Sequence, residues 1–415
     1  MKKLLLTILL IFPLVTYAAG EKPVKYKTLL REAKAAIKNK RNQANAEKNL
    51  LDIVNRPDIK KDQRTEIYFM AQELERSQWE AENMKFYLKQ PYDTTKFFST
   101  ILKMYEYLLV CDSLDLLPNE KGLVGYKYRV KNREILLAYR SNLLNGGKFL
   151  LKRNRYAAAY DHFEMYIRSS QAPIFEHYPM ILNDTLLARA AYWATVSAYN
   201  DNKPEKALRY IDRAIEGADS TLRFSLQEYK VRCLDFLGKK DERIEALVEG
   251  TRLYPRHDYF FLHLMDVYTE SKQYDKGLAL CDTLLSSIGD RNIYWLGKSQ
   301  MYLAKGENDS CIVAADNALR CDTSMVDAYY NKGVAFLNKA LRFAETACLD
   351  IRNPKCRNDR QTLQKLYREA KKPMEQVRRM APDDSKRWAS PLYRIYLNLN
   401  MGKEFAEMER LLNAQ

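Results

Sequence analysis

Histidine is scarce in this chain, and its few histidines are not spaced for metal binding. Four occur among 415 residues, at positions 162, 177, 257 and 263, and none stands in an H-E-x-x-H segment or a comparable ligand spacing. The glycines at positions 146 and 147 are not followed by the Gly-Lys-Ser/Thr signature of a phosphate-binding loop. We therefore expect a protein that is not an enzyme and uses no metal or cofactor, although a site assembled from distant residues would leave no such motif.

Long apolar runs are absent beyond the first 18 residues. Later leucine-rich pieces such as 105–110 are interrupted by charge and match buried helix faces better than a membrane span. Residues 1–18 have a basic start, an apolar stretch over 4–15 and a small residue, Ala18, at the end, which is the order of a secretory signal peptide. A first core helix is the alternative interpretation. The residue directly after Ala18 is not a cysteine, so we expect an exported protein, periplasmic or secreted, without a lipid at the cleavage site.

The chain also lacks any single block of basic residues, although its net charge is +15. Lysine and arginine are spread along the whole length, which is typical of solvated helix faces. Anionic envelope surfaces and acidic proteins are the alternative explanation for the excess charge. An exported protein rarely meets nucleic acid, so we expect none as a partner.

Small residues recur with a fixed period. Residues 300–320 contain two apolar stretches joined around Gly306 and Asn308, as turn chemistry expects for an antiparallel helix pair. The pattern repeats every 34 residues. A fixed repeat is expected because one helix pair cannot bury its own apolar face and must stack on similar pairs. One column of the repeat is Gln227, Phe261, Trp295 and Tyr329, the column four residues later is Val231, Met265, Ser299 and Gly333, and a second-helix column is Leu247, Cys281 and Ala315.

These columns resemble the tetratricopeptide repeat (TPR) family in period and residue pattern. The clearest single repeat spans 143–166, where Gly147, Ala159 and Phe163 fall on family positions. The last repeat is split, because its second helix is expected only around Ala370. Together with the segment 392–405, this split repeat is similar to exported envelope TPR proteins of Bacteroidota. The resemblance implies an all-α fold, a TPR-type α-solenoid in which antiparallel helix pairs form a right-handed superhelix.

The predicted organisation has four parts. They are a signal peptide at 1–18, a helical region of degenerate repeats at 19–140, TPR repeats at 141–382 with an insertion at about 341–366, and C-terminal capping helices at 383–415. No linker rich in proline, glycine and serine separates them, so we expect one continuous solenoid, in which Asp93 caps a helix that follows Pro91.

The resemblance further implies a scaffold that binds a protein or peptide partner along a concave groove lined by the first helices. Mixed polar and aromatic side chains suit such a partner. The Lys/Asn set that holds a terminal carboxylate in chaperone-binding relatives is not reproduced, so that ligand is not implied. The family's groove positions correspond here to Lys148, Lys152, Arg232, Tyr259, Asp266, Gln300 and Tyr330.

Glycan or surface-polymer binding is the alternative function. Tyrosine is abundant, with 29 residues, and aromatic platforms suit sugars. Most of these tyrosines, however, fall on core columns of the repeat, which explains their number without a ligand.

The insertion is expected to carry specificity. Arg352, Lys355, Arg357 and Arg360 gather near its Pro354, whereas basic residues elsewhere are dispersed. Insertions in solenoids lie on one face, often the binding face. The alternative is a helix extension with a solvated loop.

Two further predictions concern covalent chemistry. Cys348 and Cys356 bracket the loop and are candidates for a disulfide, with two free thiols as the alternative, because the sequence alone does not give the connectivity. Cys281 and Cys311 occupy core columns as expected buried thiols. The Bacteroidota resemblance also implies O-glycosylation at short Asp-Ser/Thr segments. Helix capping and turns by the aspartates, as at Asp93 and Asp184, explain these segments equally well. The candidate hydroxyls are Thr94, Ser113, Thr185, Ser220 and Thr283.

Overall fold

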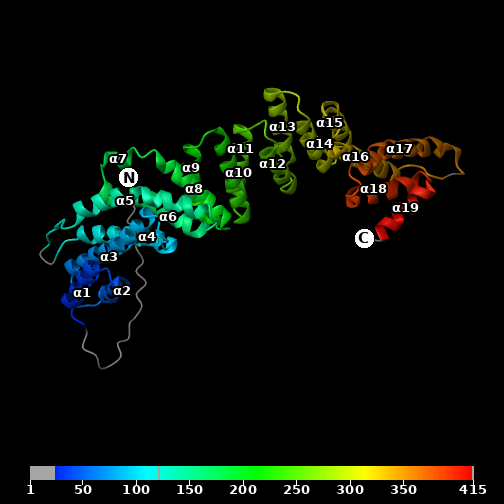
Figure 1. Cartoon of the computed structure of the whole chain (residues 1–415). Helices are drawn as coiled ribbons and strands as arrows, with labels where there is room; N and C mark the ends of the chain where they lie inside the picture. Colours follow the sequence, from blue (N-terminus) through cyan, green and yellow to red (C-terminus); the bar gives the residue numbers. More distant parts are fainter. Residues whose placement is uncertain (1–23, 120–121, 351, 414–415) are drawn as a thin grey trace. The chain divides into compact units, whose positions relative to one another are not determined.

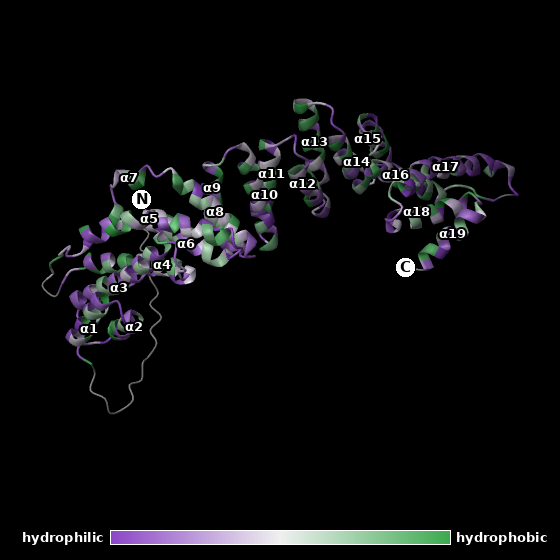
Figure 2. Cartoon of the chain, viewed as in Figure 1, coloured by the Kyte–Doolittle hydropathy of each residue, from purple (hydrophilic) through white to green (hydrophobic). Residues whose placement is uncertain are grey.

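Helices and the short segments that connect them make up the described part of the chain. The computed structural model describes residues 24–119, 122–350 and 352–413, and no strand occurs among them (Figure 1). The predicted all-α class is therefore confirmed, whereas the predicted signal peptide lies outside the described residues. No helix in these ranges has the length and apolarity that a membrane crossing requires. Hydrophobic and hydrophilic residues mix within individual helices, as amphipathic packing demands (Figure 2).

The helices form two compact units that divide between Ala218 and Asp219. This division differs from the predicted boundary after residue 140, which falls inside a single helix, Arg129–Leu151. That helix begins before the repeat pattern does, because Asn132, Ile135 and Leu136 continue its buried face towards the N-terminus. Each unit is described by itself below.

The first unit is a series of helices of which most pack on the next, except that the short helix Pro179–Leu182 is passed over and its two neighbours pack directly on each other. As predicted, the long helix of this unit ends before Pro91, and Asp93 caps the following one by accepting a hydrogen bond from the Lys96 amide at 2.9 Å. The helices are α1 (Tyr26–Asn39), α2 (Gln43–Ile53), α3 (Lys61–Tyr87), α4 (Thr94–Asp115), α5 (Arg129–Leu151), α6 (Tyr156–Ser170), α7 (Pro179–Leu182), α8 (Leu186–Asn200) and α9 (Pro204–Glu216), with a 3₁₀ turn η1 (Pro173–Phe175).

The close crossing predicted for a TPR helix pair is present between α5 and α6. Gly147 faces the ring of Phe163, and a Cβ atom on Gly147 would lie 2.5 Å from that ring. Phe163 and Ala159 are fully buried. Glycine is therefore required at position 147 because no side chain fits between the two helices.

The second unit contains the strict repeats. Its buried residues include Gln227, Phe261, Met265, Ser299 and Ala315, which confirms the predicted columns, while Trp295 and Tyr329 of the first column are half-buried. The helices are α10 (Ser220–Phe236), α11 (Lys240–Leu253), α12 (Asp258–Glu270), α13 (Tyr274–Ile288), α14 (Asn292–Lys305), α15 (Asn308–Cys321), α16 (Val326–Ala344), α17 (Arg357–Met380), α18 (Ser385–Asn398) and α19 (Gly402–Asn413), with a 3₁₀ turn η2 (Pro354–Cys356).

Ion pairs follow the same 34-residue period as the core. Lys298 on α14 binds Asp282 on α13 at 2.6 Å, and the equivalent pair one repeat later is Lys332 with Asp316. A second series joins Lys305 to Asp275 and Lys339 to Asp309. Exposed pairs of this kind add little free energy each, so their regular spacing contributes to register more than to stability.

The predicted insertion is mostly helical. The helix α16 continues to Ala344, α17 begins at Arg357, and these two helices pack against each other, so that the loop and the turn η2 occupy only residues 345–356. Leu341, Leu363 and Leu366 pack against the core of this region, which explains why the helices extend past the repeat. The structure thus matches the helix extension with a loop that the sequence left as an alternative.

Candidate partner-binding surface

The predicted groove residues fall in both units. Lys148 and Lys152 lie on α5 in the first unit, where the Lys148 ammonium is 4.3 Å from the centroid of the Trp193 ring and Lys152 is exposed. The other five belong to first helices of the second unit. We call these five, Arg232, Tyr259, Asp266, Gln300 and Tyr330, the first-helix surface.

The repeat itself positions this surface. Arg232, Asp266 and Gln300 occupy the same position in three successive repeats, since their numbers differ by 34. Among the first helices, α12 contacts α14, α14 contacts α16, and α16 contacts α18. This close stacking is what the inner side of a curved repeat stack requires.

Arg232 and Tyr259 form one contact of the surface. The Arg232 guanidinium lies 5.5 Å from the centroid of the Tyr259 ring, and that ring meets His263 edge-on at 4.5 Å. Burial raises the pKa of the Tyr259 hydroxyl, which therefore stays protonated and available as a hydrogen-bond donor. Asp266 is exposed one helical turn beyond His263, so α12 presents an aromatic ring and, about two turns further on, a carboxylate, while α10 supplies the cation.

Gln300 and Tyr330 extend the surface along the stack. The Gln300 amide donates a hydrogen bond to the Thr269 hydroxyl at 3.3 Å, which links α14 to α12. Arg387 on α18 lies 4.5 Å from the centroid of the Tyr330 ring and binds Asp327 at 2.6 Å. Arg387 was not among the predicted groove residues, because the insertion lies between it and Tyr330. Aligning the two would require subtracting the inserted residues from their separation in the sequence.

The basic residues of the insertion are not equivalent. Arg352, Lys355 and Arg357 are exposed, whereas Arg360 is partly buried and donates hydrogen bonds to the backbone carbonyls of Asp350 and, at 3.4 Å, Asn353. Arg352 pairs loosely with Asp350 at 4.0 Å, and Arg360 holds the loop in shape, so Lys355 and Arg357 are the basic side chains most open to a ligand.

A disulfide closes the same loop. Cys348 and Cys356 are joined, with their Cα atoms 4.9 Å apart. The amide of Cys348 also donates to Asp359 Oδ2 at 2.9 Å, and the Asn353 side chain accepts from the Lys355 amide at 3.0 Å. These contacts display the exposed cations on a constrained loop at the end of the α16–α17 hairpin.

The candidate glycosylation sites differ in exposure. Thr94 is half-buried at the first residue of α4, whereas Ser113, Thr185, Ser220 and Thr283 are exposed. Every aspartate of these segments has a structural contact: Asp93 and Asp219 cap α4 and α10, and Asp112, Asp184 and Asp282 pair with Arg129, Arg140 and Lys298. The aspartates thus have a packing role in every case, whether or not the hydroxyls are modified.

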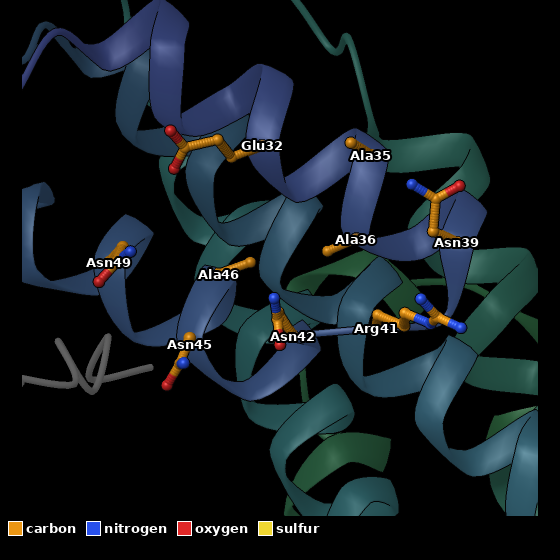
Figure 3. A pocket seen from close by; sticks show the side chains of 9 residues that line it. All are labelled: Glu32, Ala35, Ala36, Asn39, Arg41, Asn42, Asn45, Ala46 and Asn49. Carbon is orange, nitrogen blue, oxygen red and sulfur yellow. The ribbon is translucent and has the colours of Figure 1, made fainter.

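A polar hollow lies between α1 and α2, with a volume of about 660 Å³ (Figure 3). The buried Ala36 and Ala46 leave the space, and several asparagines surround it. A polar outer face fits the capping role of a helix pair at the end of a repeat stack. The asparagines are Asn39, Asn42, Asn45 and Asn49.

A buried carboxylate pair joins α2, α3 and α4. Glu47 accepts hydrogen bonds from the Tyr107 hydroxyl at 2.6 Å and from Lys103 at 3.3 Å, and Glu75 accepts from Lys103 at 3.1 Å. Burial, together with the neighbouring Glu47, raises the pKa of Glu75. In the described ranges, no group of three or more His, Cys, Asp or Glu residues is arranged to hold a metal ion. Because one lysine faces two carboxyl groups, the strength of this contact between the helices depends on whether the carboxyl groups are protonated.

No protein-family model and no curated protein matches the sequence. Several solved structures are similar at low identity. A TPR repeats protein from Bacteroides fragilis is 17% identical over 64% of this chain and 97% of its own, with a TM-score of 0.32. The C-terminal part of a TPR repeat-containing protein from Cytophaga hutchinsonii is 12% identical over 64% of this chain and 98% of its own, with a TM-score of 0.36. Yeast Tom70 is 11% identical over 94% of this chain and 91% of its own, with a TM-score of 0.34.

The TPR-type fold of this chain rests on its own packing. In the second unit, helix pairs repeat every 34 residues, small residues occupy the close crossings, and α12, α14, α16 and α18 contact one another in turn. The chain is a TPR-type helical repeat protein in its fold.

Proposed function

We propose that the protein is an exported, non-enzymatic scaffold that binds a protein or peptide partner in the cell envelope through the first-helix surface. The observation that carries this proposal is the 34-residue spacing of Arg232, Asp266 and Gln300, which occupy the same position in three successive first helices. Helices α12 and α14 pack on each other, and Arg232 of α10 reaches the Tyr259 ring of α12. An extended ligand can contact equivalent positions in successive repeats, so a regular column suits a peptide or a partner's helix.

The aromatic residues of the surface support a protein partner more than a glycan. Tyr259 and Tyr330 each have an arginine against the ring, at 5.5 Å and 4.5 Å from the centroid. A sugar that stacks on tyrosine would have to compete with these guanidinium groups, whereas tyrosine and arginine together are typical anchors of protein interfaces. Glycan binding remains the alternative function.

The test is partner capture by the chain without residues 1–18 from the envelope fraction of its native host. The variant Arg232→Ser/Asp266→Ser removes one cation and one carboxylate from the surface. The matched control, Glu245→Ser/Lys276→Ser, removes the same charges from exposed positions on the second helices α11 and α13. We expect the same prey with the wild type and the control, and about tenfold less with the surface variant.

Equal capture by the two variants would exclude this surface. Glycan binding would be favoured if the wild type and the control captured no protein but were retained on polysaccharide beads, and if only the surface variant lost this retention. Replacing Arg352, Lys355 and Arg357 by Ser tests the loop separately. Unchanged capture with unchanged thermal stability would show that the loop is only a spacer.

A further inference from the structure

Two segments of similar composition end α3 and α5 in the first unit. They read Lys-Phe-Tyr-Leu-Lys over 85–89 and Lys-Phe-Leu-Leu-Lys over 148–152. Both α3 and α5 pack on α4, and ring contacts place the ends of α3 and α5 beside the start of α4. We call residues 84–96 and 148–155 together the basic aromatic edge.

Direct contacts hold the edge together. Phe86 at the end of α3 lies 6.3 Å from Phe97 on α4, and Phe98 on α4 lies 4.7 Å from Phe149 on α5, measured between ring centroids. Arg155 donates a hydrogen bond to the Thr95 hydroxyl at 3.4 Å, which joins the two turns at the surface. The two segments therefore form one continuous surface.

The tip of this edge is apolar and exposed. Met84 is 59% exposed, Phe86 57%, Tyr87 81% and Leu88 55%, although all four are large apolar or aromatic side chains. The aromatic rings of Tyr92 and Phe97 lie directly behind Phe86, at 5.4 Å and 6.3 Å. Four exposed apolar side chains within five residues are typical of a surface that contacts another molecule or a membrane when the protein functions.

The two segments of the edge are rich in cations. The only carboxylate in the two segments is Asp93, which is already engaged as the cap of α4. Glu82, one turn before the edge, pairs with Lys85 at 2.8 Å and so neutralises one cation. Arg153 lies against the Phe149 ring at 3.7 Å, which places its charge beside the apolar surface. The cations of the edge are Lys85, Lys89, Lys96, Lys148, Lys152, Arg153 and Arg155.

We propose that the basic aromatic edge docks the protein on an anionic lipid bilayer. Phe86, Tyr87 and Leu88 would enter the interfacial zone, where aromatic and aliphatic side chains are favoured, while the surrounding lysines and arginines contact lipid phosphates. Complementary charge identifies the occupant, because the edge offers many cations with one engaged carboxylate. The apolar side chains project from a helix end and its following turn, which suits insertion into a lipid surface. This docking is independent of the first-helix surface in the second unit.

The test is co-sedimentation of the chain without residues 1–18 with vesicles of phosphatidylglycerol and phosphatidylcholine, or of phosphatidylcholine alone. We expect binding to the anionic vesicles, at least about tenfold weaker binding to the neutral ones, and loss of binding when ionic strength rises from about 0.1 M to about 1 M, which shortens the Debye length from about 10 Å to about 3 Å. Binding that is equal on both vesicles, or absent, would overturn the proposal.

Two variants locate the contact. Phe86→Ser/Tyr87→Ser/Leu88→Ser removes the apolar tip, and Lys89→Gln/Lys152→Gln/Arg153→Gln removes charge; each is expected to weaken anionic binding about tenfold. The control is Phe236→Ser, which removes a 77% exposed aromatic side chain from α10 in the other unit. Circular dichroism establishes that each variant is folded. Unchanged vesicle binding by either folded variant, or an equal loss with the control, would overturn the assignment, as would an acidic protein that binds this edge while vesicles do not.

Discussion

Arg387 lies against the ring of Tyr330, 4.5 Å from its centroid, and binds Asp327 at 2.6 Å. The arginine belongs to α18 and both partners belong to α16, so these contacts join the C-terminal helix pair to the first helix of the interrupted repeat. The insertion between them leaves the stack without breaking it, because successive first helices still meet.

The coupling between Arg387 and Asp327 is expected to be modest. Both side chains are partly exposed, so a double-mutant cycle with Arg387→Ala and Asp327→Ala should give a coupling free energy of about 0.5–1 kcal/mol. Chemical denaturation of the four proteins provides the measurement. Additive single losses would contradict a direct pair.

Gly147 should tolerate no side chain. Gly147→Ala forces a Cβ against the ring of buried Phe163, and the expected loss of unfolding free energy is about 1–3 kcal/mol. Gly125→Ala is the matched control in the same unit, because a Cβ there meets nothing within 4 Å. A second change, Phe163→Leu, should recover part of the loss in the Gly147 variant. Equal stability of the two alanine variants would contradict the close crossing.

Stability should fall with rising pH because of Glu75. Burial and the neighbouring Glu47 raise the folded-state pKa of Glu75 above its ordinary value of 4.5, so the folded chain binds the proton more tightly than the unfolded chain. Its contribution is complete below pH of about 4.5 and is lost as pH rises through the folded-state pKa. Lys103, which donates a hydrogen bond to Glu75, opposes this rise of the pKa only in part.

The variant Glu75→Gln isolates this effect. We expect its unfolding free energy to decline less between pH of about 5 and about 8 than that of the wild type, since the amide does not titrate. Denaturation at several pH values measures the difference. Parallel pH profiles for the two proteins would show that Glu75 does not titrate differently on folding.

The cysteines should react in a fixed order. Cys321 is exposed and should be alkylated first in the native protein, whereas Cys281 and Cys311 are buried and burial raises the pKa of each thiol to about 12. Peptide mapping without reduction should find Cys348 and Cys356 linked. Free thiols at both positions in protein from its native host would remove the disulfide.

Modification should favour the exposed hydroxyls. If the protein is O-glycosylated in its native host, Ser113, Thr185, Ser220 and Thr283 should carry the sugar before half-buried Thr94, because an enzyme must reach the oxygen atom. The mass of the intact protein from its native host, followed by peptide mapping, measures this. A mass equal to that of the unmodified mature chain would rule modification out.

The sequence by itself determined the helix pairs and their stacking. The burial of Phe261, Met265 and Ser299 could be predicted because a repeat brings each core position to the same environment every 34 residues. The cap at Asp93 and the buried thiols Cys281 and Cys311 were also predictable, because capping and burial on a periodic face are local properties of the chain. The positions of the proposed groove residues on first helices follow from the same period.

The tertiary structure alone decided the contacts that join distant segments. Arg387 meets Tyr330 across the insertion, Glu47 meets Lys103 across three helices, and Phe98 meets Phe149 between α4 and α5. It also decided that Arg360 braces its loop while Arg352 is exposed, and that the units divide after Ala218. Such contacts depend on how helices of unequal length and irregular period cross, and a hydrophobic pattern records which face is buried but not which partner covers it.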